Sequence, residues 1–127
     1  MQSLSVQTNK SLPEAEAMIR SALGAVGFGI LSEIDLGATL ASKLDRSVGD
    51  LKIIGACNPQ FAYDALMADR SVSLLLPCNV VLDAIPTGTR ISIPAPAGLL
   101  PDRPEITQPV TDLLRTALAT IGEVIVG

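Results

Sequence analysis

Two cysteine-asparagine dipeptides are the residues of this sequence best suited to chemistry. They are Cys57-Asn58 and Cys78-Asn79, and they contain both cysteines of the 127-residue chain. A thiol becomes a nucleophile or a soft ligand when it ionises, and an asparagine amide offers hydrogen-bond donors and an acceptor. The chain has no histidine. Nucleophiles activated by histidine, histidine acid-base catalysis and histidine metal ligation are therefore excluded.

The flanking residues predict where each dipeptide lies. Leu51 to Ala56 is a short apolar run that indicates a strand, and Asn58-Pro59 has the residue types of a helix N-cap and first helical position. Cys57 is therefore expected at a junction between a strand and a helix. Val72 to Leu82 is the most strand-like run of the chain, but Pro77 within it predicts an edge strand or a bulge just before Cys78.

The rest of the chain supplies elements that position these dipeptides. Ser11 and Glu14 have the spacing of a capping box, which predicts a helix over about 12 to 26 that ends at Gly27. Further patterns predict strands at 3–8, 28–34 and 90–93, a short helix between 36 and 44, a turn at 85–89, an irregular proline-rich connection at 94–109, and a last helix over about 110–121.

This order of elements, β-α-β-α-β-α-β-β-α, predicts an α+β fold. We expect two layers, with the helices on one face of a mainly antiparallel or mixed sheet. The length predicts a single domain over residues 1–127.

Composition limits the classes of partner. The net charge is −4 and the only aromatic residues are Phe28, Phe61 and Tyr63, so nucleic-acid binding is not expected. The sequence contains neither a secretory signal nor an apolar run that spans a membrane, which predicts a soluble cytoplasmic protein with reduced thiols. Charged residues make up only 17% of the chain. Too little charge is present to cover the surface, so we expect a homodimer.

A motif over residues 53–81 resembles the signature of the family called domain of unknown function 302. Gly-Ala-Cys-Asn-Pro at 55–59, Ala-Tyr at 62–63, Ala-Leu at 65–66 and Leu-Leu-Pro-Cys-Asn-Val at 75–80 follow the order and spacing of that family. The resemblance implies a small α+β fold and homodimerisation, with no established activity. Relatives found beside sulfur-metabolism proteins imply a role with thiols or sulfur.

Three functions remain open for the dipeptides. The first is binding of a small molecule or sulfur species at a site formed by Cys57, Asn58, Tyr63, Cys78 and Asn79. The second is a structural or interaction module in which the cysteines are buried and the asparagines cap a helix and a turn. The third is a thiol-dependent enzyme that uses Cys57, activated by the helix N-terminus.

Other polar residues are less informative. Tyr63 is predicted on the third helix, where its hydroxyl is either a ligand contact or simply exposed at the core edge. Glu33 and Asp35 share a strand face, either as a carboxylate pair or as a solvated strand end. No cofactor is expected, and no metal site, because structural zinc needs four ligands and one chain offers two thiols.

Overall fold

An antiparallel sheet of six strands, ordered β2-β3-β4-β5-β1-β6, forms the framework of the molecule. The structure is a computed structural model that describes residues 1–127. Its elements are β1 (Ser3–Thr8), α1 (Leu12–Ala25), β2 (Gly29–Asp35), α2 (Leu36–Leu44), β3 (Leu51–Cys57), α3 (Pro59–Ala68), the 3-10 helix η1 (Arg70–Leu75), β4 (Cys78–Ile85), β5 (Gly88–Pro94), α4 (Pro96–Leu99), α5 (Pro104–Ala119) and β6 (Ile125–Val126).

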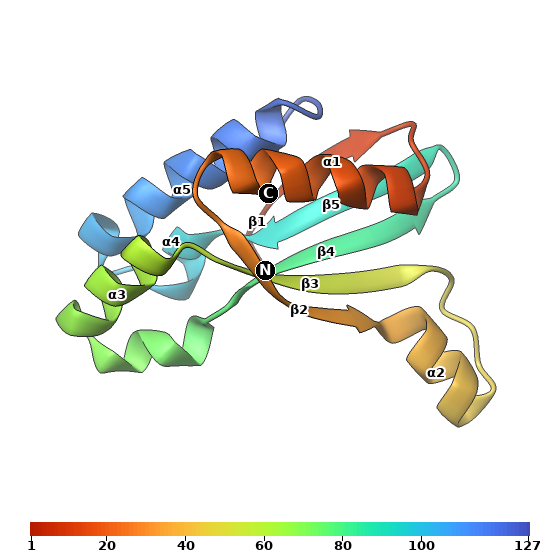
Figure 1. Cartoon of the computed structure of the whole chain (residues 1–127), viewed down its shortest axis with the longest axis horizontal. Coiled ribbons are helices and arrows are strands. Elements are labelled where there is room, and N and C mark those ends of the chain that lie inside the picture. Colours follow the sequence, from red (N-terminus) through yellow and green to blue (C-terminus); the bar gives the residue numbers. More distant parts are fainter.

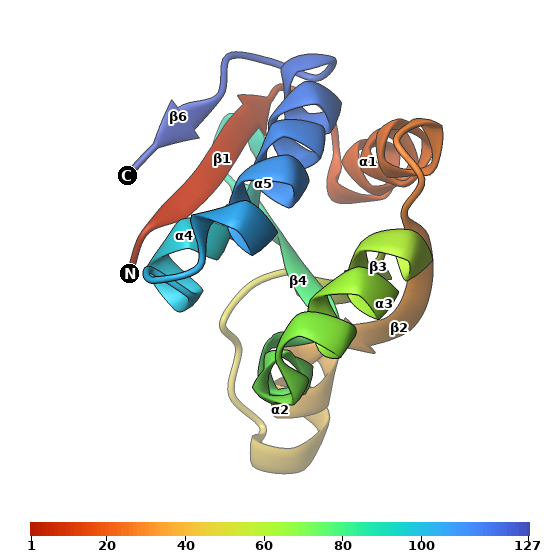
Figure 2. The same cartoon turned by 90° about the vertical axis from the view of Figure 1, so that its left-hand side faces the viewer.

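The helices α1 and α5 pack side by side on one face of this sheet (Figures 1 and 2). Strand alternation supplies the apolar side chains beneath them, because every second residue of a strand points to the same face. Leu4 and Val6 of β1, for example, are fully buried against Leu114 and Leu118 of α5 in one continuous core cluster. The α+β prediction, with helices on one face of an antiparallel sheet, is confirmed.

Both predicted helix N-caps are confirmed. Ser11 Oγ accepts a hydrogen bond from the backbone N–H of Glu14 at 3.4 Å, and Asn58 Oδ1 accepts one from Phe61 N–H at 3.1 Å. Gly27, where α1 was expected to end, has a φ of +90°, a conformation that glycine adopts without steric cost. Local side-chain chemistry therefore sets these helix boundaries.

The prediction of a strand over 72–82 is wrong in its first half. Residues 70–75 form the helix η1 instead, because Asp69 Oδ1 accepts hydrogen bonds from the N–H and hydroxyl of Ser71 and starts a helical turn. Strand β4 begins only at Cys78, and it is a central strand rather than an edge strand. Pro77 lies just before it and joins Leu76 through a cis peptide bond.

The proline-rich segment is more regular than predicted. It contains the short helix α4 and the first turns of α5, which starts at Pro104 rather than near residue 110. Pro104 occupies the first turn of α5, where a missing N–H costs nothing, and Pro109 lies inside the helix. The two-residue strand β6 was also missed, because so short a strand carries no periodic pattern. No helix of this fold has the length and apolar character needed to cross a membrane.

Candidate functional site

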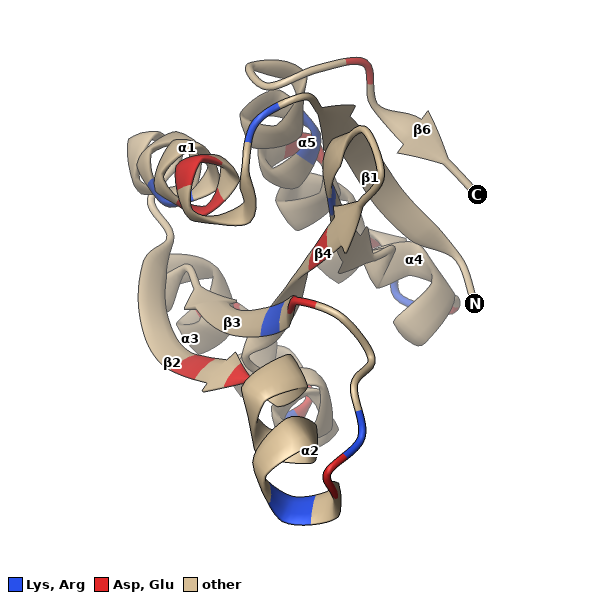
Figure 3. Ribbon diagram, turned by 90° about the vertical axis from the view of Figure 1, so that its right-hand side faces the viewer, with Lys and Arg blue, Asp and Glu red and all other residues tan.

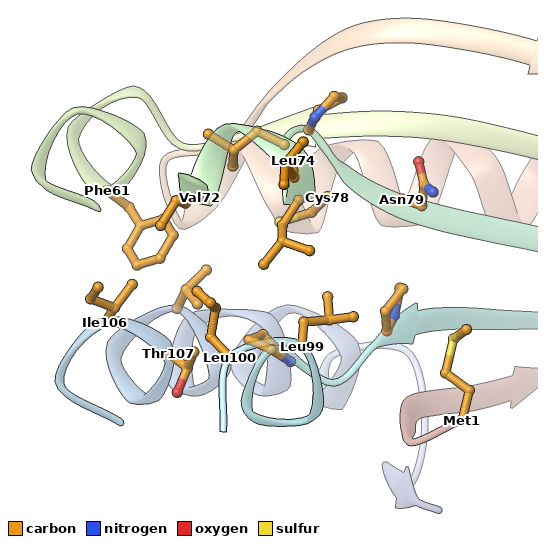
Figure 4. Close-up of a pocket in the computed structure, with 16 residues that line it drawn as sticks. Met1, Phe61, Val72, Leu74, Cys78, Asn79, Leu99, Leu100, Ile106 and Thr107 are labelled. Atoms are coloured by element: carbon orange, nitrogen blue, oxygen red, sulfur yellow. The ribbon is translucent and has the colours of Figure 1, made fainter. Parts of the chain in front are cut away.

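An apolar cavity of about 380 Å³ lies at one end of the sheet, next to Cys78. One wall comes from α3, η1 and the start of β4, and the opposite wall from α4 and α5 (Figure 4). The walls carry mainly aliphatic and aromatic side chains, including Phe61, Val72, Leu74, Leu99, Leu100 and Ile106. A volume of this size falls within the range of roughly 300–1,000 Å³ typical of small-molecule sites.

The cavity occurs where two neighbouring strands stop pairing. The ladder between β4 and β5 runs from Ile85 and Gly88 to Val81 and Ser92 and ends there, although both strands continue. In the same register Val80 would lie opposite Ile93, and the next hydrogen-bonded pair would join Asn79 to Pro94. Proline has no N–H, so it cannot donate the hydrogen bond that would extend the ladder. Asn79 and Pro94 both line the cavity.

Cys78 presents a neutral thiol to this cavity. It lies opposite Ala56 and in alternation with the buried Val80 and Leu82, so its side chain is on the face of the sheet that the helices cover. Burial raises the pKa of Cys78 to about 11, and the nearby Cys57 contributes to the same shift. At neutral pH the Cys78 side chain is therefore a small, weakly polar part of the wall rather than a thiolate.

The lining of the cavity carries no charged side chain. The polar residues of the lining besides Cys78 are Thr107 and Asn79, and strand alternation directs the side chain of Asn79 to the other face of the sheet from Cys78. Close by, an ion pair joins the two walls: Arg103 Nη1 lies 3.2 Å from Asp69 Oδ2. Hydrogen bonds from the hydroxyl and backbone of Ser71, together with Arg103, lower the pKa of Asp69.

The first dipeptide has a different environment from the second. Cys57 ends β3, and it is not part of the cavity lining. Both groups of the Asn58 amide are engaged, because Oδ1 caps α3 and Nδ2 donates to the carbonyl of Val26 at 3.3 Å. Asn58 thereby ties the start of α3 to the end of α1. The two Cys-Asn dipeptides have similar sequences but different contacts.

The other residues singled out from the sequence lie away from the cavity. Tyr63 is on α3 with 63% of its side chain exposed, and it does not line the cavity. Glu33 forms ion pairs with Arg20 and Lys52, and Asp35 Oδ1 accepts a hydrogen bond from Ala38 N–H at the start of α2. Both carboxylates therefore have structural partners.

The sequence analysis did not identify the apolar residues that build most of the cavity. The wall residues of α4 and α5 come from the proline-rich segment, and those of η1 from a run predicted as a strand. Five prolines between residues 94 and 109 were the available signal that the chain there departs from regular packing. Both cysteines are free thiols, and no group of three or more cysteine, aspartate or glutamate side chains is arranged to hold a metal ion.

Comparison with known proteins identifies a family and solved structures similar to this chain. The family model "Domain of unknown function DUF302" matches residues 4–121. The crystal structure of an uncharacterized conserved DUF302 protein from Bacillus stearothermophilus is similar to this chain, with 25% sequence identity and a TM-score of 0.87. The similarity covers 94% of this chain and 97% of that one. The comparison with curated proteins gave no match.

Proposed function

Because the chain belongs to the family of domain of unknown function DUF302, its function must be argued from its own site, and we propose that it binds a small apolar molecule in the cavity beside Cys78. The observation that carries the proposal is an apolar cavity of about 380 Å³ formed where β4 and β5 separate. Apolar walls with a few polar groups are typical of sites that bind small molecules through burial of their surface.

This proposal narrows the site expected from the sequence to Cys78 and Asn79. Of the five candidate residues, these two line the cavity, whereas Cys57, Asn58 and Tyr63 do not. A raised pKa at Cys78 favours binding over nucleophilic chemistry, because the thiol remains protonated at neutral pH. A thiol-dependent reaction at Cys57 is a separate hypothesis that needs another site.

Binding of the neutral apolar dye Nile red tests this proposal. We expect saturable fluorescence enhancement with the wild-type protein, at least tenfold weaker affinity for Leu99→Trp, and unchanged affinity for Met67→Trp. Leu99 is 39% exposed and lines the cavity, so the larger side chain can fill it without disturbing the core. Met67 is an exposed residue of α3, outside the cavity, and controls for the introduction of tryptophan. Equal affinity for both variants would contradict the proposal.

We also propose that the chain forms a homodimer through the edge of the sheet at β2 and the adjoining α2. This region projects from the rest of the molecule (Figure 3), and strand β2 has one unpaired edge. Four large apolar side chains there are at least half exposed: Leu31, Ile34, Leu44 and Val48. An exposed apolar strand edge favours pairing with a second copy.

Light scattering after gel filtration tests the homodimer. The wild-type protein should elute with the mass of two chains. Ile34→Lys should shift it towards one chain, because a charge would then be buried at the interface. Tyr63→Lys, at a similarly exposed position on α3, should leave the dimer intact. A wild-type protein with the mass of one chain would exclude the proposed dimer.

A further inference from the structure

The point where β4 and β5 separate leaves one backbone acceptor without a strand partner. Ala95 N–H donates to Gln2 on the β1 side, so by alternation Pro94 faces β4. The same alternation directs the backbone carbonyl of Asn79 towards β5, where Pro94 has no N–H to offer. Asn79 is exposed and lines the cavity, so its carbonyl is an acceptor available to a ligand at the edge of the cavity.

We infer that the cavity selects an uncharged, mainly apolar molecule whose head group is a hydrogen-bond donor, such as an alcohol or a primary amide, held by the backbone carbonyl of Asn79. This inference rests on the proposed binding function and adds the chemical class of the ligand. Asn79 lines the cavity, and its carbonyl lies just beyond the point where the ladder between β4 and β5 ends.

The uncharged lining of the cavity disfavours ionic ligands. No arginine, lysine, aspartate or glutamate side chain lines the cavity, so a buried carboxylate or ammonium head group would have no opposite charge to pair with. Met1 lies at the cavity but is fully exposed, so its amino group remains hydrated and its field is screened. A carboxylate has a second disadvantage, because it can only accept hydrogen bonds and the Asn79 carbonyl needs a donor.

Pro94 is the specificity-determining residue in this arrangement. Its missing N–H leaves the Asn79 carbonyl free for a ligand. Pro94→Ala supplies that N–H and allows the ladder to extend to Asn79, which places a protein donor where the ligand donor would bind. Pro101→Ala is the matched control, because Pro101 lies between α4 and α5 and does not line the cavity.

Calorimetric titration with three molecules of equal chain length tests the inference: decanol, decanoate and decylamine. For the wild-type protein at neutral pH we expect decanol to bind at least tenfold more tightly than either charged molecule. In Pro94→Ala the affinity for decanol should fall at least tenfold, whereas Pro101→Ala should keep it within twofold. Thermal unfolding of each variant confirms that it is folded before the titration.

The outcomes separate this inference from the proposed function. If Nile red binds but decanoate or decylamine binds as tightly as decanol, or decanol does not bind, the ligand class is wrong while the binding function stands. Unchanged decanol affinity in Pro94→Ala would overturn the role of the Asn79 carbonyl. Absence of Nile red binding would instead remove the proposed function on which the inference rests.

Discussion

Ala56 and Cys78 lie directly opposite each other on the antiparallel strands β3 and β4. Opposite residues share a face of the sheet and successive residues alternate, so Cys78 points towards the helices, and alternation directs Cys57, one residue after Ala56, towards the other face. The two thiols are neighbours in the sheet without facing each other. Because of this register, the two cysteines of these similar dipeptides point to opposite faces of the sheet.

Alkylation should distinguish native from unfolded Cys78. In the Cys57→Ala protein, the remaining thiol should react with iodoacetamide at least tenfold more slowly at pH 8 in the native state than in urea. The reason is that burial, the larger of the two causes that raise the pKa of Cys78 to about 11, remains when Cys57 is removed and keeps the thiolate fraction low.

Mass spectrometry of timed samples measures this rate. Similar native and denatured rates for Cys78 would show that its thiol is not protected by the cavity wall. The raised pKa also has a consequence for stability: its contribution is complete below pH 9.0 and is lost as the pH rises through about 11.

Replacing the two asparagines should have unequal effects on stability. Asn58→Ala removes the cap of α3 and the hydrogen bond to Val26, so we expect a loss of about 1–2 kcal/mol in the free energy of unfolding. Asn58→Asp keeps an oxygen that can accept the capping hydrogen bond, so it should lose less stability than Asn58→Ala. Asn79→Ala removes an exposed amide without a protein partner and should change stability by less than about 0.5 kcal/mol. Urea unfolding measures all three, and equal losses at both positions would contradict the assignment.

Gly55→Ala should destabilise the contact between Gly55 and Pro77, which belong to the segments 55–59 and 75–80 of the family motif. A methyl group at Gly55 would overlap Ser32 Oγ and lie 2.8 Å from Pro77 Cγ, so strand β3 or Pro77 must move. Such overpacking costs about 1–3 kcal/mol. Gly24→Ala is the matched control: its added methyl group meets nothing within 4 Å, and alanine favours the helix that contains it. Thermal unfolding should show a lower midpoint only for the Gly55 variant.

Lys52→Met should weaken the attachment of α1 to the sheet. Lys52 Nζ lies 2.7 Å from Glu16 Oε1 and also pairs with Glu33, and hydrogen bonds with these two carboxylates raise its pKa. Without this cation the two carboxylates rely on Arg20 alone, and we expect a loss of about 1 kcal/mol. Lys43→Met, at an exposed lysine outside these ion pairs, should have little effect.

The dependence on pH provides a second measurement of the same contact. Burial opposes ionisation of Glu16, but hydrogen bonds from Lys52 and Arg20 outweigh it and lower the pKa of Glu16 below 4.5. A lowered pKa means that the stabilisation is present above pH 4.5 and is lost as the pH falls through the folded-state value. The difference in stability between wild type and Lys52→Met should therefore shrink in acid. A difference that does not change with pH would show that the ion pair with Glu16 is not the source of the stability that Lys52 contributes.

The sequence predicted most elements because their signals are local. Strand Ser3–Thr8 agrees with the prediction, and α1 and α3 begin where Ser11 and Asn58 indicated, since a cap and its partner lie within one helical turn. The strand expected from Val72 failed for a related reason. Two hydrogen bonds between Asp69 and Ser71 start a helical turn there. Such local side-chain hydrogen bonds compete with strand formation, and a prediction from strand propensity does not include them.

The fold class, the family motif and the absence of histidine chemistry follow from the amino-acid sequence alone, because composition, periodicity and short motifs do not depend on distant contacts. The different surroundings of the two Cys-Asn dipeptides arise instead from strand pairing and packing between distant segments. Cys78 and Asn79 line the cavity, whereas Cys57 lies outside it. The side-chain amide of Asn58 donates a hydrogen bond to the carbonyl of Val26, which lies far away in the sequence. The cavity lies beyond the point where the pairing of β4 and β5 ends, and this end of the pairing is a relationship between segments that no local sequence pattern reveals.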